Sequence, residues 1–262
     1  MKIQIASDLH LELRRNHEPE FHDFYPVEDR DLLVLAGDIG SYMNAWGFVE
    51  EELRRSPVIY VPGNHEYYSW QTREHIDAAW KHKAKQNPDL HYLIAESVTI
   101  GGVRFWGAPW YSDLFSRRAP GYLRLFADSI NDFDPKYDDF GRWTVHRHLE
   151  EHARQTGFLR EQAGQVDVVI THWPPTRHAI APRFEGDALN GYFVNDNEGL
   201  VHTIGAKVWI SGHVHHAYRA VIGDTLVIGN PTGYPFDGGE RPLFRPDLAI
   251  DVEPGVQVEW GE

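Results

Sequence analysis

Several short apolar runs in this sequence each end just before residues that can bind a metal ion. Six runs have the length and the Val, Ile and Leu content of buried strands, and they cover residues 2–6, 31–36, 58–61, 166–170, 207–210 and 225–228. Five are followed by Asp, Asn or His, in the motifs Asp8-Leu9-His10, Gly37-Asp38, Gly63-Asn64-His65-Glu66, Thr171-His172 and Gly212-His213-Val214-His215. Ligands in open α/β sheets bind outside the carboxyl ends of strands. We therefore expect these side chains to converge although they are far apart in the chain.

Helical patterns separate the early strands. Segments 44–55 and 69–85 carry apolar residues at helical spacing, and segment 142–164 does so ahead of the fourth run. Apolar pairs on either side of Gly101-Gly102 indicate a β-hairpin within residues 91–110. Alternating strands and helices, together with a hairpin, predict an α/β fold with mixed sheets.

The domain organisation follows from what the sequence does not contain. No linker-like composition and no repeat divides the chain, so we expect a single domain over residues 1–262. Segment 111–141 is aromatic and acidic without clear periodicity. It is either a packed surface loop or a cap that faces the substrate.

Composition limits the chemistry. The chain has no cysteine, so any metal must be bound by nitrogen and oxygen. The formal net charge of -14 is spread along the sequence without a basic patch, which disfavours long nucleic acid as a partner and favours a small substrate. Charged residues interrupt the first segment and no run of about 18 apolar residues occurs. We expect no membrane span, no secretory signal and a cytoplasmic location.

The spacing within the motifs suggests how they act. Residues at i and i+2 of extended backbone point the same way, so Asp8 and His10 can bind one ion. The same spacing places His213 and His215 on one side of their turn, one available to each of two metals. Glycines precede the ligands where a side chain would obstruct close approach, at Gly37, Gly63 and Gly212.

Each motif alone also has an ordinary structural explanation. An Asp after a strand is commonly a helix cap, an Asn after Gly is commonly a turn, and an isolated His is most often a satisfied core residue. The occurrence of all five motifs after predicted strands is what favours a functional site.

This ordered set resembles the signature of the calcineurin-like metallophosphoesterases, and it spans residues 8–215. The resemblance implies a four-layer fold in which a β-sandwich of two mixed sheets is flanked by helices. It also implies a set of roles: a first metal on Asp8, His10 and His215, a second on Asn64, His172 and His213, Asp38 bridging both, and His65 as the catalytic histidine.

One departure from the family pattern narrows the subgroup. Protein phosphatases of this class continue the Gly-Asp motif with a second Asp and with an Arg that binds phosphate, whereas Gly37-Asp38 is followed here by Ile39-Gly40-Ser41-Tyr42. The missing Arg disfavours a protein phosphatase, and the sequence is more similar to the small bacterial phosphodiesterase-like branch. It also leaves the group that orients His65 undetermined.

The resemblance implies a small phosphate-ester substrate and a mechanism. Two ions, chosen from Mn, Fe, Zn or Ni, would activate a bridging hydroxide for in-line attack on a phosphodiester or, less favoured, a phosphomonoester. Some relatives have lost the metals and act as binding modules, so a metal-binding or metal-free scaffold on the same fold is the alternative; the complete ligand set favours the enzyme. We expect substrate contacts from Trp110, Asn131, Asp132, Trp173 and Tyr234.

Overall fold

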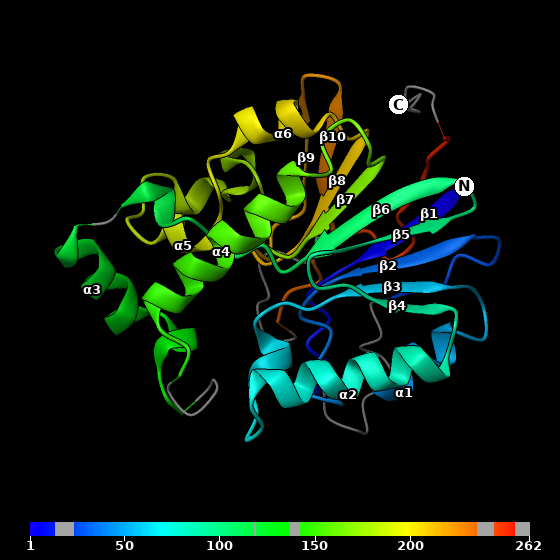
Figure 1. The fold of residues 1–262 in the computed structure, drawn as a ribbon, viewed down its shortest axis with the longest axis horizontal. Helices are drawn as coiled ribbons and strands as arrows, with labels where there is room; N and C mark the ends of the chain where they lie inside the picture. The colour runs from blue at the N-terminus through cyan, green and yellow to red at the C-terminus, as the bar shows by residue number, and fades with distance from the viewer. Residues whose placement is uncertain (14–23, 118, 137–141, 235–243, 255–262) are drawn as a thin grey trace.

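The computed structural model describes residues 1–13, 24–117, 119–136, 142–234 and 244–254. Their strands form two sheets that pack face to face (Figure 1). The first sheet has the order β11-β1-β2-β3-β4 and consists of β1 (Lys2–Ala6), β2 (Leu32–Ala36), β3 (Val58–Val61), β4 (Leu90–Tyr92) and β11 (Ala249–Asp251). The second has the order β5-β6-β7-β8-β10-β9 and consists of β5 (Glu96–Ile100), β6 (Val103–Ala108), β7 (Val168–Thr171), β8 (Val208–Ser211), β9 (Tyr218–Ile222) and β10 (Thr225–Gly229).

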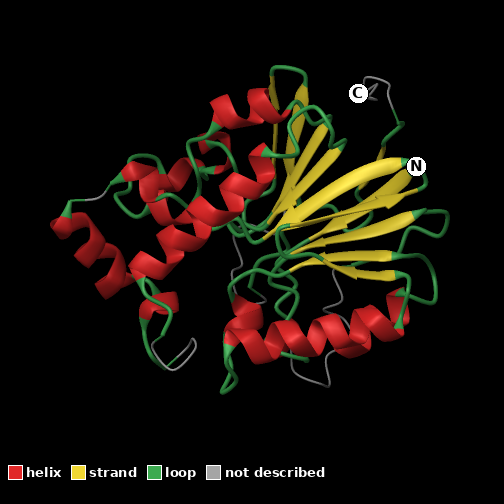
Figure 2. Ribbon diagram, viewed as in Figure 1, coloured by secondary structure: helices red, strands yellow, loops and turns green. Residues whose placement is uncertain are grey.

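Both sheets are mixed, as the sequence predicts. In the first, β1 to β4 are parallel and β11 joins β1 antiparallel; in the second, β6, β7, β8 and β10 are parallel, with β5 and β9 antiparallel at the edges. The helices lie outside the sheets (Figure 2). They are α1 (Trp46–Glu52), α2 (Arg73–Gln86), α3 (Pro120–Ser129), α4 (Val145–Arg160), α5 (Asn190–Phe193) and α6 (Glu198–Ile204).

Three apolar clusters hold four layers together. Between the sheets, residues such as Ile5 and Val34 of the first pack with Phe105 and Ile210 of the second. Outside the first sheet, residues of α1 and α2 pack against β2 and β3, and outside the second, residues of α4 and α6 pack against β7 and β8. Because the central strands are covered on both faces, they are continuously apolar, and all five residues of β2 are fully buried. The predicted four-layer architecture is confirmed.

Side-chain caps decide where the long helices begin. Thr72 has extended backbone and its side chain accepts a hydrogen bond from the His75 amide, so α2 begins at Arg73 and not at residue 69 as the periodicity suggests. Thr144 caps α4 in the same way through the amide of Arg147. Apolar spacing therefore located both helices, and the caps set their first residues.

The predicted hairpin is also present. Strands β5 and β6 pair antiparallel with Ile100 opposite Val103, and the connecting Gly101 and Gly102 have φ values of 55° and 83°. Two consecutive positive φ angles are what a tight two-residue hairpin turn needs, and glycine adopts them without steric cost.

The described part of segment 111–141 contains α3, which projects away from the sheets (Figure 1). Phe126 of α3 packs into a cluster with Trp143, Trp173 and Tyr192, so this part of the segment is anchored to the rest of the molecule. Among the described helices, none combines the length and the apolar character needed to cross a membrane.

Candidate metal centre

The carboxyl ends of the parallel strands of both sheets meet at one place, and sharp backbone turns begin there. Five candidate ligands have left-handed backbone, with φ of 55° at Asp8, 46° at His10, 54° at Asp38, 72° at His213 and 49° at His215. The extended backbone expected at Asp8 and His10, and at His213 and His215, is therefore wrong. Left-handed non-glycine residues are costly and concentrate at functional sites.

Two glycines allow the loops of this site to approach each other closely. A Cβ on Gly63 would lie 2.2 Å from Asp38 Oδ1 and 2.6 Å from His172 Nε2, and a Cβ on Gly212 would lie 2.6 Å from Asp8 Oδ2. No real Cβ tolerates such distances. Because Gly63 and Gly212 have no side chain, Asp38, His172 and Asp8 can take these positions. Such close approach beside the glycines is what the sequence predicts.

One group of candidate ligands joins the ends of β1 and β8. Nε2 of His10 lies 3.0 Å from Nε2 of His215, and that atom of His215 lies 3.5 Å from Asp8 Oδ1. Asp8 is held in place because both of its carboxylate oxygens accept from the His213 amide, at 3.0 and 3.1 Å. The three side chains can place their donor atoms around a single ion.

A second group joins the ends of β2, β7 and β8. Nδ1 of His172 donates to the Ala36 carbonyl at 2.8 Å, which leaves Nε2 of the same ring facing Asp38 Oδ2 at 3.4 Å. Neither His172 Nε2 nor His213 Nε2 has a hydrogen-bond partner, although both are buried. Buried polar atoms are rarely left unpaired, so two nitrogens without partners beside a carboxylate fit a bound cation.

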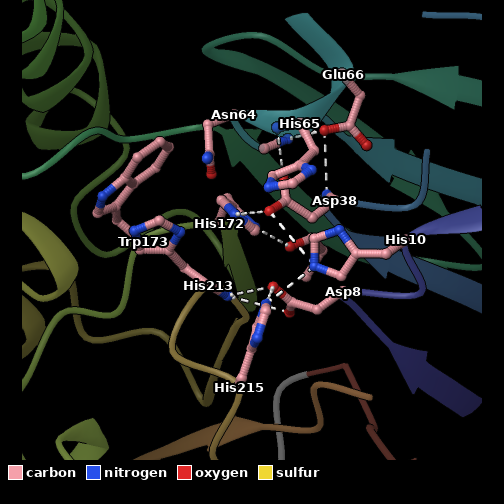
Figure 3. Close-up of polar contacts among 12 residues, drawn as sticks. Asp8, His10, Asp38, Asn64, His65, Glu66, His172, Trp173, His213 and His215 are labelled. Atoms are coloured by element: carbon pink, nitrogen blue, oxygen red, sulfur yellow. Dashed lines mark hydrogen bonds and ion pairs between the residues drawn. The ribbon is translucent and has the colours of Figure 1, made fainter. Parts of the chain in front are cut away.

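Asp38 lies between the two groups (Figure 3). Its Oδ2 is 3.4 Å from His172 Nε2 and 4.0 Å from His10 Nε2, while its Oδ1 accepts from the His65 amide at 2.8 Å. Oδ1 is therefore held by a backbone amide, and Oδ2 faces nitrogens of both groups. This is the placement that a bridging carboxylate requires.

The electrostatics of the centre favour a positive charge. Burial raises the pKa of Asp8 because ionisation there costs solvation; His172 opposes this shift, the Asp38 carboxylate adds to it, and the resulting pKa is about 7. Burial, together with the nearby His172, holds the pKa of His213 well below its usual value, so its imidazole is neutral and offers a lone pair. Burial lowers the pKa of His172, but the charges of Asp38 and Asp8 outweigh it and raise the pKa to about 10, so these carboxylates favour a positive charge beside them. Buried carboxylates and imidazoles are a donor set that fits divalent metal ions.

Asn64 is oriented by residues that sequence reasoning did not connect to it. Its Nδ2 donates to Asp132 Oδ1 at 3.0 Å, and Tyr68 and Tyr192 donate their hydroxyls to the same Asp132 carboxylate. Because a carboxylate only accepts hydrogen bonds, the Asn64 amide must turn its oxygen the other way. That Oδ1 is buried without a partner and is available to a metal.

His65 lies between a carboxylate and a phenol. Its Nδ1 is 2.9 Å from Glu12 Oε1, and its Nε2 is 3.0 Å from the Tyr234 hydroxyl. Burial lowers the pKa of His65, but the charges of Asp38 and Glu12 outweigh it and raise the pKa to about 9. Glu12 thus occupies the place of the orienting carboxylate that the Gly37-Asp38 loop lacks. In the sequence, the feature that could have indicated this role is the position of Glu12 two residues after the candidate ligand His10.

A match to the sequence model of the calcineurin-like phosphoesterases covers residues 1–217. The chain belongs to this family. Uncharacterized protein L509 of Acanthamoeba polyphaga mimivirus is 22% identical over an alignment 286 positions long, which covers 96% of both chains. The phosphopantetheinyl hydrolase PptH of Mycobacterium tuberculosis has a similar structure, with a TM-score of 0.70 at 17% identity over 99% of this chain and 98% of PptH. A dimetal phosphatase from Danio rerio gives a TM-score of 0.53 at 15% identity over 87% and 86% of the two chains.

A further residue organises the loops of this calcineurin-like phosphoesterase. The buried Glu66 accepts hydrogen bonds from the amides of Asp38, Ile39 and Gly63, at 3.1, 2.8 and 2.7 Å, and from the Tyr60 hydroxyl at 2.7 Å. It therefore ties the turn after β2 to the turn after β3. The Gly63-Asn64-His65-Glu66 motif contains this residue, but the motif alone does not indicate that it ties the two turns together.

A cavity of about 440 Å³ opens beside the candidate ligands. Of the expected substrate contacts, Asn131, Asp132 and Tyr234 line it. Trp110 and Trp173 are not among the lining residues: both are fully buried, and their indole nitrogens donate to Thr156 and to the Tyr192 carbonyl. Trp173 instead packs behind a candidate ligand, with its ring centroid 4.4 Å from that of His213 (Figure 3). Much of the remaining lining comes from residues 180–194, from which we had expected no substrate contact.

Proposed function

We propose that this family member is a two-metal hydrolase of phosphodiesters. The observation that carries the proposal is the convergence of nitrogen and oxygen donors from two sheets, three of which (Asn64 Oδ1, His172 Nε2 and His213 Nε2) are buried and have no hydrogen-bond partner. In this proposal one metal is held by Asp8, His10 and His215, the other by Asn64, His172 and His213, and Asp38 contacts both.

The metals would supply a water activated for attack and would neutralise charge on the phosphate oxygens. Nitrogen and carboxylate donors suit Mn, Fe, Zn or Ni. The protein itself supplies the rigid frame: Glu66 fixes the loop of Asp38, and Asp132 fixes the amide of Asn64. Such outer hydrogen bonds hold ligands in place for the metal.

His65 is proposed as the group that assists the departing oxygen. Glu12 holds its Nδ1, and its Nε2 is directed toward Tyr234, which lines the cavity. From this position Nε2 can donate a hydrogen bond or a proton to a leaving alcohol bound in the cavity. Tyr234 would then contact the same oxygen or a neighbouring one.

The charges around the cavity support a diester over a monoester. Within the part of the chain that the structure describes, Arg183 is the one Lys or Arg that lines the cavity, and its guanidinium lies over the Phe184 ring, 4.6 Å from the ring centroid. Asp132 and Asp187 also line the cavity. A diester carries one negative charge, which the metals can balance, whereas a monoester dianion would need further cations.

The test is metal content together with a substrate panel. Purified protein should hold about two Mn ions per chain after equilibration and should hydrolyse bis(p-nitrophenyl) phosphate faster than p-nitrophenyl phosphate. Asp38→Ala should lose metal and activity. Asp89→Ala should behave as wild type, because Asp89 is exposed and does not line the cavity.

Each alternative has its own outcome. Metal binding without turnover of any monoester, diester or cyclic nucleotide would favour the scaffold interpretation. Full activity in a folded Asp38→Ala variant would contradict the bridging role.

A further inference from the structure

The cavity beside the metal centre is larger than a phosphate group requires, and its lining combines two kinds of residue. Asp38, Asn64, His65 and His215 belong to the candidate site, whereas other lining residues are apolar and come from separate segments. Cavities of several hundred Å³ usually bury most of an organic ligand. The volume of about 440 Å³ therefore leaves room for a substituent next to the phosphate.

The apolar part of the lining starts at the candidate ligands themselves. The Phe193 ring stacks on the His213 ring, with centroids 5.4 Å apart and an interplanar angle of 27°, and 36% of Phe193 is exposed. The lining also includes Phe184, which is 43% exposed, Ile130 of the 111–141 segment, and Val214. We call Phe184, Phe193, Ile130 and Val214 the apolar wall; its two aromatic rings belong to partly exposed residues.

Local hydrogen bonds hold the wall in position. The Phe184 carbonyl accepts from Asn190 Nδ2 at 2.6 Å and from the Asp187 amide at 3.0 Å. A Cβ on Gly191 would lie 3.1 Å from the Leu114 backbone, so α5, which carries Phe193, packs tightly against the segment after β6. The wall is thus preformed, so ligand binding does not carry the entropic cost of ordering this loop.

The charges of the described residues around the cavity disfavour a second anionic group. Asp132 and Asp187 both line the cavity, and Arg183, whose guanidinium is stacked over Phe184, is the one Lys or Arg among the described lining residues. A substituent that carried another phosphate would approach these two carboxylates. An uncharged apolar or aromatic substituent meets no such repulsion and removes apolar surface from water.

We infer that the substrate is a phosphodiester with one large apolar or aromatic substituent, which lies on the apolar wall while the phosphate occupies the metal centre. This inference rests on the proposed diesterase function and adds the class of ester. It assigns Phe184 and Phe193, neither of which was marked by the sequence, as residues that determine specificity.

The experiment compares two diesters that share a leaving group and a charge. Methyl p-nitrophenyl phosphate and phenyl p-nitrophenyl phosphate are assayed with the Mn-loaded protein. We expect kcat/KM for the phenyl ester to exceed that for the methyl ester by about tenfold or more, since even single methylene groups in apolar pockets change kcat/KM by this order. Phe184→Ala should reduce the preference to near unity, and Phe184→Leu should restore part of it.

A matched control and the possible outcomes separate the two hypotheses. Phe158→Ala removes a ring of similar exposure, 41%, that is not part of the cavity lining, and it should keep the wild-type preference. Equal turnover of both diesters by the wild type, or an unchanged preference in metal-loaded Phe184→Ala, would overturn the inference while leaving the hydrolase function intact. No turnover of either ester by metal-loaded protein would overturn the proposed function, and the inference with it.

Discussion

Gly63→Ala is the smallest change that should dismantle the proposed metal centre. Gly63 does not have positive φ, so an alanine is compatible with its backbone and the effect comes from space alone. The added Cβ would lie 2.2 Å from Asp38 Oδ1, 2.6 Å from His172 Nε2 and 2.7 Å from His172 Cδ2. Two candidate ligands are thus displaced by a single methyl group.

The size of the effect follows from these contacts. An ordinary Cβ contact begins at 3.4 Å, so the neighbouring atoms must move by about 1 Å in a close-packed interior. The His172 ring cannot rotate away easily, because its Nδ1 is bonded to the Ala36 carbonyl. Overpacking of this kind typically costs about 1 to 3 kcal/mol. Metal sites tolerate ligand shifts of only about 0.2 Å, so we expect the metal held by Asn64, His172 and His213 to be lost.

Two measurements separate the packing effect from the metal effect. Urea unfolding in EDTA should show the destabilisation of about 1 to 3 kcal/mol, and metal analysis after equilibration with Mn should show at most about one ion per chain instead of two. Gly157→Ala is the control, because Gly157 is exposed on α4 with no atom within 4 Å of its Cβ position; alanine there should stabilise the helix by about 0.5 to 1 kcal/mol. Two bound ions and normal activity in Gly63→Ala would refute this reasoning.

Three further predictions concern residues around the centre and in the core. Glu12→Gln should lower kcat by about tenfold to a hundredfold with most of the metal retained, because the carboxylate that faces His65 Nδ1 is neutralised; steady-state kinetics and metal analysis would measure both. His65→Ala should slow diesters with poor leaving groups more than activated aryl diesters, since it removes the proposed donor to the departing oxygen; a leaving-group series would measure the difference. Burial raises the pKa of Asp77 from 3.8 to about 6, so the wild type gains stability from this residue at acid pH and loses it as the pH rises through 6. Asp77→Asn, which keeps an oxygen to accept from the hydroxyls of Tyr67 and Tyr92, should therefore be more stable than wild type by up to about 3 kcal/mol at pH 8 and equal to it near pH 4, as measured by urea unfolding in EDTA.

Each of these predictions can fail in a distinct way. Unchanged kcat in Glu12→Gln would show that the contact to His65 has no catalytic effect. A uniform loss across leaving groups in His65→Ala would argue against a role at the departing oxygen. A stability difference between Asp77→Asn and wild type that does not change with pH would mean that Asp77 does not titrate with a raised pKa.

The strands and the positions of the candidate ligands could be predicted from local sequence. Strands β1 and β3 have the bounds of the predicted runs 2–6 and 58–61, because short apolar runs bounded by polar residues are buried on both faces in a parallel sheet. The ligand motifs follow these strands directly, and the glycines beside them allow the contacts that were expected. The order of apolar and polar residues along the chain is enough to predict these strands and the ligand positions that follow them.

The backbone at the site departed from the expected one. Asp8, His10 and His213 adopt left-handed conformations, which intrinsic preferences disfavour and which surrounding contacts must therefore impose. The His213 amide, for example, donates to the Asp8 carboxylate across the two sheets. Propensity applied to a short motif cannot include a partner about two hundred residues away.

What the sequence alone determined is the set of chemical groups, the strands that carry them and, through the family motifs, the four-layer fold. Only the tertiary structure decided which distant groups support them: Glu12 lies against His65, Asp132 against Asn64, and Phe193 of the apolar wall stacks on His213. The physical reason is that strand formation depends on neighbours along the chain, whereas these contacts depend on how the two sheets and their loops pack. Trp110 and Trp173 illustrate the same limit, since an aromatic residue near a motif packs in the core or lines a cavity according to what lies opposite it.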